Sequence, residues 1–439
     1  MRSEARRSWR VRSALAVALV GAAISVWSMS AATAGPSAKR DVAPLLKADD
    51  ASAIPDRYIV VMKNGTERRF VTSASESVKS MGGSVTATYR HALRGFAAQM
   101  SPAAVAEVRA NPDVAYVEAD TKVSLTTTQT NATWGIDRID QRSLPLSTTY
   151  NYTSTGSGVT AYIIDTGVLN SHNEFGGRAS SGFTAINDGR GTTDCNGHGT
   201  HVAGTVGGTT YGVAKQVSIV AVRVLDCGGS GSNSGVIAGI DWVTSNHAAG
   251  APAVANMSLG GGASAALDAA LNNSINDGVS HVVAAGNSNT TACNTSPARV
   301  ANALTVGATT SSDARSSFSN YGTCLDLFAP GSSITSAWYT SNSATNTISG
   351  TSMASPHVAG AVARYLQNNR SASPATVSAA INGNATPNVV GNAGSGSPNR
   401  LLYVSPTDGG PVDPPPSTTT SSTTTSTTQP CEWWWWWCW

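Results

Sequence analysis

Charged side chains are scarce in this 439-residue chain. Asp, Glu, Lys and Arg together make up 12% of the residues, and the formal net charge is +2 at pH 7. Lysine almost disappears after residue 126, because Lys215 is the only lysine from there to the end. A region without a basic cluster offers little to nucleic-acid phosphates or to an anionic membrane surface. We therefore expect no nucleic-acid partner, and we expect the protein to be a monomer.

An apolar run long enough to anchor the chain in a membrane is also missing at the N-terminus. The mostly apolar run at residues 14–26 is shorter than the roughly 20 residues that a spanning helix needs. It follows a segment with five arginines, and small residues at Ala32 and Ala34 fit a signal-peptidase site. Residues 1–34 are predicted to be a signal peptide of a secreted, extracellular protein; a retained membrane helix is the alternative.

Residues 35–126 differ in composition from the rest and are predicted to form a small unit of their own. A β-branched run at 58–62 predicts a strand, and a helix is predicted over 67–81. Strands at 84–89 and 95–100, a helix from Ser101-Pro102 to 110, and a strand at 114–118 follow. This order predicts an α+β unit of ferredoxin-like type. An independent adhesive domain is the alternative interpretation.

Residues 127–405 have the pattern of an α/β domain. Apolar strands are predicted at 160–164, 217–224, 253–257, 281–285 and 303–306, with helical stretches between them. Apolar strands separated by helices favour a parallel sheet with helices on both faces. About 280 residues is an ordinary size for one α/β domain.

Three motifs place an acid, a base and a nucleophile in that order along this domain. The strand at 161–164 leads to Asp165, His198 lies between two glycines at a predicted helix start, and Ser352 precedes a helical stretch at 353–367. A serine at a helix N-terminus lies beside free N–H groups that favour developing negative charge. An isolated serine there is more often an N-cap. The other two motifs favour a nucleophile, with a base and an orienting carboxylate.

His201, three residues after His198, is a competing candidate for the base. Two histidines this close could also suggest a metal, but the glutamate of a zinc-protease helix is absent and no third ligand is evident. A packed, non-catalytic histidine is the simpler interpretation of His201.

The three motifs together, in this order, resemble those of the subtilase family of serine peptidases, and within it the proteinase K branch of aqualysin type. The similarity runs from about Trp134 to Tyr403. It implies a subtilisin-like fold and a serine endopeptidase in which Ser352 attacks, His198 is the base and Asp165 orients it. It also implies that residues 35–126 are an inhibitory prosegment, cut near Thr126-Thr127 after an extended, product-like end at 122–126. A non-catalytic binding protein on the same scaffold is the other function class, which we would expect to lack one of these residues.

The resemblance assigns further residues to the site. Asn287 is implied as the side-chain donor to the oxyanion, and protein or peptide substrates are expected to lie extended between two segments. The primary substrate pocket is expected to be lined by small residues and therefore to admit large apolar or aromatic side chains. Asn233 replaces an aromatic residue of proteinase K, which leaves the preference four residues upstream of the cut open. The implied substrate-binding residues are Gly229, Ser230, Gly231, Ser258, Leu259, Gly260, Ala284, Ala285 and Gly286.

Six cysteines behind a predicted signal peptide indicate disulfides rather than metal ligands. The sequence by itself allows several pairings. The resemblance implies that Cys195 pairs with Cys227 and that Cys293 pairs with Cys324.

Structural calcium is the cofactor that the resemblance implies. Asp326 matches a family ligand, with the carbonyls of Ala301 and Ala303 as further oxygens, which suit Ca²⁺. A second site is suggested by Asp137, Asp140 and Gln141. Ser147 and Thr149 replace ligands that some relatives carry in that loop, so this second site is expected to be weak or empty.

The chain ends in two unusual segments. Residues 406–430 are a Pro/Ser/Thr-rich linker that cannot bury a core. Residues 431–439, CEWWWWWCW, hold six of the eleven tryptophans of the chain. This tail is interpreted either as a truncated or mistranslated module, or as a small loop closed by Cys431 and Cys438 that offers aromatic faces to a polysaccharide or a membrane interface.

Overall fold

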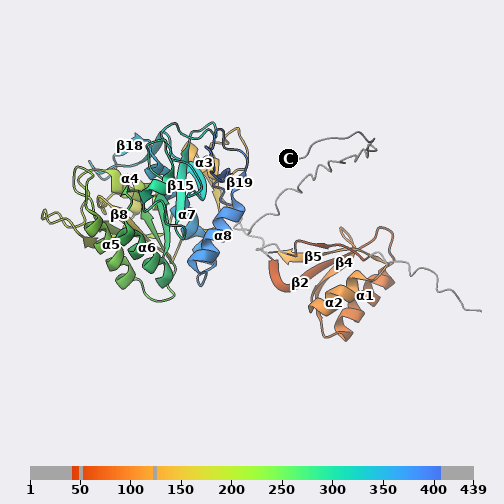
Figure 1. Ribbon diagram of the computed structural model, residues 1–439. Helices are drawn as coiled ribbons and strands as arrows, with labels where there is room; N and C mark the ends of the chain where they lie inside the picture. The colour runs from red at the N-terminus through yellow and green to blue at the C-terminus, as the bar shows by residue number, and fades with distance from the viewer. Residues whose placement is uncertain (1–41, 49–52, 122–125, 407–439) are drawn as a thin grey trace, which may run out of the picture.

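The computed structural model describes residues 42–48, 53–121 and 126–406 (Figure 1). The predicted signal peptide, nearly all of the linker, the Trp-rich tail and residues 122–125 before the predicted cut lie outside these ranges. Within the described ranges, no helix combines the length and the apolar character that a membrane span requires.

The first unit is a five-stranded sheet with two helices packed on one face. Its strand order is β1-β5-β2-β4-β3, and all pairs except β1 with β5 are antiparallel. Side chains from both helices, among them Val71, Val78 and Val105, form one core with Val60 and Phe96 of the sheet. This confirms the predicted ferredoxin-like α+β unit, to which the structure adds a short strand, β1. The elements are β1 (Leu45–Leu46), β2 (Ala53–Met62), α1 (Arg68–Ser80), β3 (Ser84–Tyr89), β4 (Gly95–Gln99), α2 (Pro102–Arg109) and β5 (Val114–Thr121).

The second unit is built on a nine-stranded sheet with the order β19-β20-β16-β15-β13-β11-β8-β10-β9. All neighbouring strands are parallel except β19 with β20 at one edge. The predicted parallel α/β fold is therefore confirmed. The strands are β8 (Thr160–Asp165), β9 (Ala179–Thr184), β10 (Ser218–Arg223), β11 (Ala253–Met257), β13 (Ser280–Ala284), β15 (Leu304–Thr309), β16 (Leu327–Pro330), β19 (Thr386–Pro387) and β20 (Arg400–Leu401).

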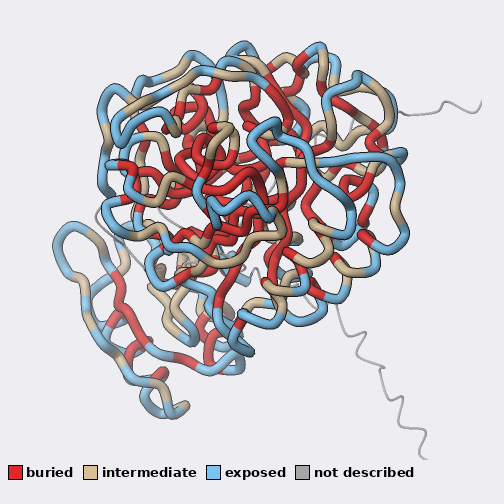
Figure 2. The backbone as a smooth tube through the Cα atoms, turned by 90° about the vertical axis from the view of Figure 1, so that its left-hand side faces the viewer, coloured by how far each residue is buried: buried red, intermediate tan, exposed pale blue. Residues whose placement is uncertain are grey.

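Alternating side chains of the central strands enter two separate cores. Ala161 and Ile163 of β8 pack in the core that includes α4 (His198–Gly207), α7 (Thr351–Asn368) and α8 (Pro374–Asn384). Tyr162 and Ile164 pack in the core that includes α5 (Asn233–Asn246) and α6 (Ala265–Asp277). Helices thus cover both faces of the sheet (Figure 1), and the buried segments run through the middle of the larger unit in Figure 2.

Shorter elements lie around this sheet. A helix, α3 (Trp134–Ile139), and two 3₁₀ turns, Asn173–Phe175 and Ala292–Asn294, lie in the connections. Three antiparallel strand pairs are β6 (Thr127–Thr130) with β7 (Thr149–Tyr152), β12 (Gly261–Gly262) with β14 (Thr295–Ser296), and β17 (Ile334–Ala337) with β18 (Thr345–Ile348).

Candidate active site

Three adjacent parallel strands bring candidate site residues to one edge of the sheet. β8, β11 and β13 are neighbours, so their carboxyl ends lie side by side. Asp165 is the last residue of β8, Ser258 follows β11 directly, and Asn287 comes shortly after β13. The carboxyl edge of a parallel sheet is where α/β proteins bind their ligands. The topology therefore gathers residues from a span of more than a hundred positions of the sequence.

The side chains of Asp165 and His198 are in direct contact. His198 is the first residue of α4, and its Nδ1 donates to Oδ1 of Asp165 over 2.8 Å. Asp165 is fully buried, and its Oδ2 has no hydrogen-bond partner within the part of the chain that the structure describes. The buried carboxylate thus favours a protonated Nδ1 on His198 and leaves Nε2 as the basic nitrogen.

Opposing effects act on the pKa of His198. Burial by itself would lower this pKa, but the charge of Asp165, the hydrogen bond to Asp165 and the charge of Asp194 outweigh it. The net result is a pKa above the ordinary value of 6.5. A raised pKa makes the imidazole a stronger base and stabilises the imidazolium that forms when it accepts a proton.

Asp194 is a residue for which the sequence suggested no role, although it opens the His198 motif. It is buried, and its two oxygens accept hydrogen bonds from the backbone N–H groups of Asn196, Gly197 and Thr200 and from two hydroxyls. These bonds fix the turn that enters α4, where Gly197 has a φ of 108°. A carboxylate near the first turn also interacts favourably with the helix dipole.

His201 is the packed histidine that the simpler interpretation expected. It is fully buried, and its Nε2 lies 3.0 Å from the carbonyl oxygen of Ile334. Burial lowers the pKa of His201 to about 4, although the bond to Ile334 opposes this shift. Among the described residues, no histidine or carboxylate joins His198 and His201 in a metal-sized cluster.

Ser352 is the second residue of α7 rather than its N-cap. The helix begins at Thr351, its N-cap is Gly350, and no side chain caps it. The N-cap interpretation of Ser352 is therefore wrong. Its hydroxyl donates to the carbonyl oxygen of Ser258 over 3.2 Å, and not to His198. Catalytic hydrogen bonds of this kind are often incomplete before a substrate binds.

The amide of Asn287 is held against the start of α7. Its Oδ1 accepts the N–H of Thr351 over 2.8 Å and the hydroxyl of Thr351 over 3.0 Å. Two donors on one oxygen identify that atom as the carbonyl oxygen of the amide. The NH₂ group of Asn287 is consequently turned away from Thr351.

Gly350 leaves a small space beside two hydrogen-bond donors. A Cβ atom on Gly350 would lie 3.6 Å from the N–H nitrogen of Ser352 and 3.7 Å from Nδ2 of Asn287. The N–H of Ser352 and the NH₂ of Asn287 thus lie at similar distances from the same position beside Gly350. An oxyanion hole needs such a pair of preorganised donors.

A cleft of about 570 Å³ extends from His198 between the two predicted substrate segments. It is lined by Gly229, Ser230, Gly231 and Asn233 on one side and by Ser258, Leu259 and Gly260 on the other. Ala284, Ala285 and Gly286 are not among the described residues that line it. Ala284 and Ala285 are buried, and the N–H of Gly286 donates to the Thr351 hydroxyl over 3.1 Å. This bond holds the segment against the start of α7.

The structure forms both disulfides that the resemblance implied. Cys195 pairs with Cys227 and Cys293 pairs with Cys324. The first links the turn before α4 to the loop that continues into Gly229, so it connects the segment next to His198 to one wall of the cleft. The amide of Asn196 strengthens the same link by donating to the Cys227 carbonyl over 3.0 Å.

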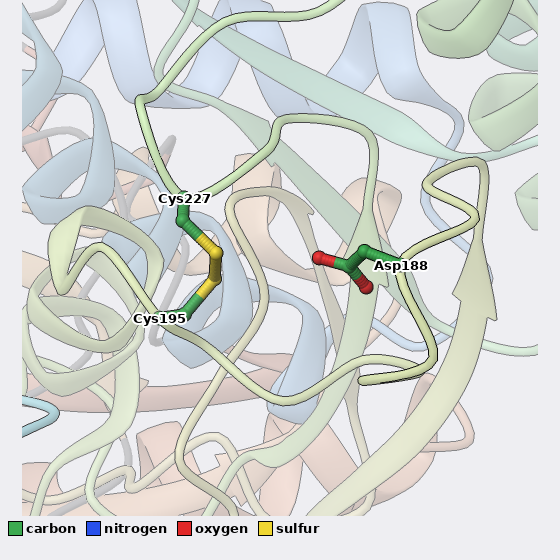
Figure 3. Close-up of side chains that lie close together, drawn as sticks. All are labelled: Asp188, Cys195 and Cys227. Atoms are coloured by element: carbon green, nitrogen blue, oxygen red, sulfur yellow. A yellow bond between two sulfur atoms is a disulfide. The ribbon is translucent and has the colours of Figure 1, made fainter.

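Asp188, Cys195 and Cys227 lie close enough together to suggest a metal site (Figure 3). The sulfurs are joined in a disulfide, so neither is the thiolate that binds metals. The fully buried Arg223 instead donates to both oxygens of Asp188, over 2.8 and 2.6 Å. These bonds lower the pKa of Asp188 to about 2. The cluster is a buried arginine with its carboxylate partner and not a metal centre.

Asp326, the first calcium candidate, has the character of a hard-cation ligand. Its oxygens accept only the N–H of Thr305, over 2.8 Å, and the amide of Asn382, over 3.2 Å, within the described chain. Burial raises its pKa, although these bonds oppose the shift. A divalent cation would offset the cost of burying this charge, and Ala301 and Ala303 lie in the segment that leads into Thr305. Asp326 therefore remains a candidate calcium ligand, with one protein donor on each of its oxygens.

The second candidate set fits a metal less well. Both oxygens of Asp137 already accept bonds from the loop, from the N–H and hydroxyl of Ser147 and the N–H of Thr148. Asp140 accepts the N–H and the amide of Asn151, and burial raises its pKa to about 6. The amide of Gln141 donates to two carbonyls of the same loop. These bonds occupy both oxygens of Asp137 and one oxygen of Asp140.

Comparisons with known proteins agree with this geometry. Residues 156–403 match the subtilase family, and residues 57–126 match the peptidase inhibitor I9 family. The chain belongs to the subtilase family of serine proteinases. The first match covers more than half of the chain, and the second covers most of the first folded unit, which is therefore a prosegment of the I9 type.

Two individual subtilases are similar to this chain over a longer stretch than the family match at residues 156–403. The "Extracellular serine proteinase" of Thermus sp. (strain Rt41A) is 58% identical over 390 residues, which cover 84% of this chain and 94% of that protein. The "Alkaline serine exoprotease A" of Vibrio alginolyticus is 54% identical over 376 residues, which cover 82% of this chain and 70% of that protein. The crystal structure of a cold adapted subtilisin-like serine proteinase is 60% identical, with a TM-score of 0.61, covering 63% of this chain and 99% of that chain.

Proposed function

We propose that this subtilase is a secreted serine endopeptidase made as a self-processing zymogen, with Asp165, His198 and Ser352 as its catalytic triad. The observation that carries the proposal is the 2.8 Å contact between His198 and the buried Asp165, at the same sheet edge as Ser352 and Asn287. The Asp165 carboxylate raises the pKa of His198, and the proposed nucleophile lies in the first turn of α7.

The mechanism follows from the hydrogen-bonding roles of these groups. When a substrate binds, the Ser352 hydroxyl exchanges the Ser258 carbonyl for Nε2 of His198 and attacks the scissile carbonyl carbon as its proton passes to Nε2. The N–H of Ser352 and the NH₂ of Asn287 stabilise the oxyanion; losing one such donor costs about 100-fold to 1,000-fold in turnover in a related enzyme. His198 then returns the proton to the leaving amine, and a water molecule repeats the sequence on the acyl-enzyme.

The proposed substrates are proteins and peptides bound in an extended conformation. The segments that contain Gly229 to Gly231 and Ser258 to Gly260 flank the cleft and are proposed to pair with the substrate backbone on its two sides. Ala284, Ala285 and Gly286 are proposed to contribute backbone to the pocket for an apolar or aromatic side chain. Asn233 is exposed at the cleft and leaves the more distant pocket open.

Secretion and zymogen processing complete the proposal. The predicted signal peptide, the two disulfides and the extracellular naming of the relative from Thermus favour an extracellular enzyme. The I9-type unit directly before residue 127 is proposed to inhibit the enzyme until the chain is cut near Thr126-Thr127.

Calcium is proposed to bind at Asp326 and at the carbonyls of Ala301 and Ala303. Its role there is structural, because Asp326 lies outside all three catalytic motifs. We leave Asp137, Asp140 and Gln141 out of the calcium proposal because the Asp137 oxygens are occupied by loop donors.

Ser352→Ala in the full chain tests the assignment of the nucleophile. We expect loss of peptide hydrolysis, no release of the prosegment and no mass increase from a serine-reactive phosphonate. Ser349→Ala is the matched control, because Ser349 lies in the same motif but its hydroxyl only accepts the N–H of Ser333. Wild-type hydrolysis by purified Ser352→Ala would refute the assignment, and it would equally refute the alternative of a non-catalytic binding protein.

A further inference from the structure

The carbonyl group of Ser352 lacks its regular partner in the α7 helix. In an α-helix the carbonyl of residue 352 accepts the N–H of residue 356, and residue 356 is Pro356, which has no N–H. Buried carbonyls need a donor, because an unsatisfied one destabilises the fold. The residue that carries the proposed nucleophile therefore depends on a donor from outside its own helix.

Ser258 supplies that donor from the end of β11. Its hydroxyl donates to the Ser352 carbonyl oxygen over 2.8 Å, while the Ser352 hydroxyl donates to the Ser258 carbonyl oxygen over 3.2 Å. The two residues thus hold each other by a reciprocal pair of bonds. Only 3% of Ser258 is exposed, and its hydroxyl is directed at the Ser352 carbonyl inside the protein.

Asn256 fixes the direction in which Ser258 donates. Its Nδ2 donates to the Ser258 hydroxyl oxygen over 2.8 Å, so the hydroxyl proton is directed to the Ser352 carbonyl. Its Oδ1 accepts the hydroxyl of Ser355 over 2.7 Å, which settles the orientation of the amide. Asn256 is 1% exposed and Ser355 is fully buried, so water does not compete for these bonds.

We propose that Asn256 and Ser258 are positioning residues for the nucleophile, acting as a substitute for the helical hydrogen bond that Pro356 removes. This inference rests on the proposed role of Ser352. Asn256, held by Ser355, orients Ser258, and Ser258 fixes the backbone of Ser352 relative to β11. Ser352 supplies both the attacking hydroxyl, from its side chain, and one of the two oxyanion donors, its backbone N–H. The position of the Ser352 backbone therefore affects the stability of the transition state more than the binding of the substrate.

Ser258→Ala and Asn256→Asp test this role in two different ways. Ser258→Ala removes the donor. Asn256→Asp keeps the shape of the side chain, but a carboxylate accepts from Ser258 and draws its proton away from the Ser352 carbonyl. For both variants we expect kcat on a peptide anilide to fall about 10-fold, less than the ~100-fold that a 1 Å misplacement can cost, with KM within about 2-fold of wild type.

A matched control separates positioning from stability. Ser274 is also a fully buried serine, and its hydroxyl bonds to His281 over 2.8 Å, away from the site. We expect Ser274→Ala to lower the melting temperature with kcat unchanged. All variants are matured by adding a trace of tagged wild-type enzyme that is then removed, so slow self-processing does not decide the outcome.

Restoring the helical donor provides the decisive experiment. Pro356→Ala returns an N–H to residue 356, which can then bond to the Ser352 carbonyl. We expect Ser258→Ala to cost several-fold less in kcat in the Pro356→Ala background than in the wild type, a non-additivity typical of residues that serve the same group. The rate of inactivation by phenylmethylsulfonyl fluoride, which does not fill the extended cleft, should follow the same order.

The inference is overturned if Ser258→Ala and Asn256→Asp lower the melting temperature but leave kcat and the inactivation rate at wild-type values. It is also overturned if the cost of Ser258→Ala is equal in both backgrounds. These outcomes differ from a failure of the proposed function, which would appear as activity remaining in Ser352→Ala.

Discussion

At the scale of single residues, the charge of Asp194 acts on His198, the proposed catalytic base, without a direct contact. This charge is one of the influences that raise the pKa of His198, after those of Asp165. His198 must be neutral to accept a proton, so activity should rise with pH as His198 loses its proton. Asp194→Asn removes the charge and should lower the pKa of His198. We expect the acid limb of the kcat/KM profile to move to lower pH.

The control for this experiment is Asp241→Asn, which removes an exposed carboxylate on α5. Its acid limb should coincide with that of the wild type. An acid limb of Asp194→Asn that stays in place or moves to higher pH would contradict the electrostatic account, even if the variant is less stable.

The sequence predicts residue identities better than residue contacts. Asp165 and His198 could be found because each stands at a recognisable element boundary, and the structure places them 2.8 Å apart. The contacts of Ser352 could not be found, because its hydrogen-bond partner Ser258 is 94 positions away and follows strand β11, whereas Ser352 lies in helix α7. The alternative interpretation of Ser352 as an N-cap failed for a related reason: the chain enters α7 through Gly350, whose extended conformation the residue types alone do not reveal.

At the scale of elements, the loop around Asp326 should make stability depend on calcium. A bound ion stabilises the folded state by mass action, by about 2.7 kcal/mol when free calcium exceeds Kd ~100-fold. We expect the melting temperature to rise with free calcium and to fall with a chelator, before kcat changes. Asp326→Asn should remove most of this dependence.

Asp137→Asn is the matched variant, because it alters the second candidate set. It should keep the calcium dependence of the wild type, whatever its own stability. A melting curve that is the same in chelator and in millimolar calcium would rule out the site, and loss of the dependence in Asp137→Asn alone would move calcium to the other loop.

The elements that the sequence did not predict are polar or rely on distant partners. The central strands were expected within a few residues, since apolar runs such as β11 are buried on both faces. β6 reads TTQT and β18 reads TNTI, so neither shows a buried face. β6 exists because it pairs with β7, and β18 because it pairs with β17. Pairing of this kind is a property of the assembled domain and leaves little trace in a local pattern.

At the scale of the whole molecule, the described residues form a small unit with its own core, followed by a larger unit whose sheet joins strands distant in sequence. The prosegment has one core shared by its sheet and its two helices. The larger sheet joins strands in the order β11-β8-β10-β9, which brings together segments far apart in the sequence. Non-local parallel pairing is slow to form. The sequence predicted both units, but the strand order of the larger one depends on pairings that local patterns do not encode.

We therefore expect the prosegment, residues 35–126, to speed folding of the catalytic unit and to inhibit it once folded. Denatured Ser352→Ala protein of residues 127–405 should refold in higher yield when the prosegment is added, because a docked prosegment lowers the barrier to assembling the sheet. Active enzyme should lose activity as the prosegment is titrated in, because its product-like end competes with substrate for backbone pairing.

A prosegment that ends at residue 121 provides the matched comparison: it keeps the folded unit and should still assist refolding, but it should inhibit only weakly. Equal refolding yields and no inhibition at micromolar concentration would mean that the segment is a spacer, whereas full inhibition by the shortened form would locate inhibition in the folded unit instead of its end.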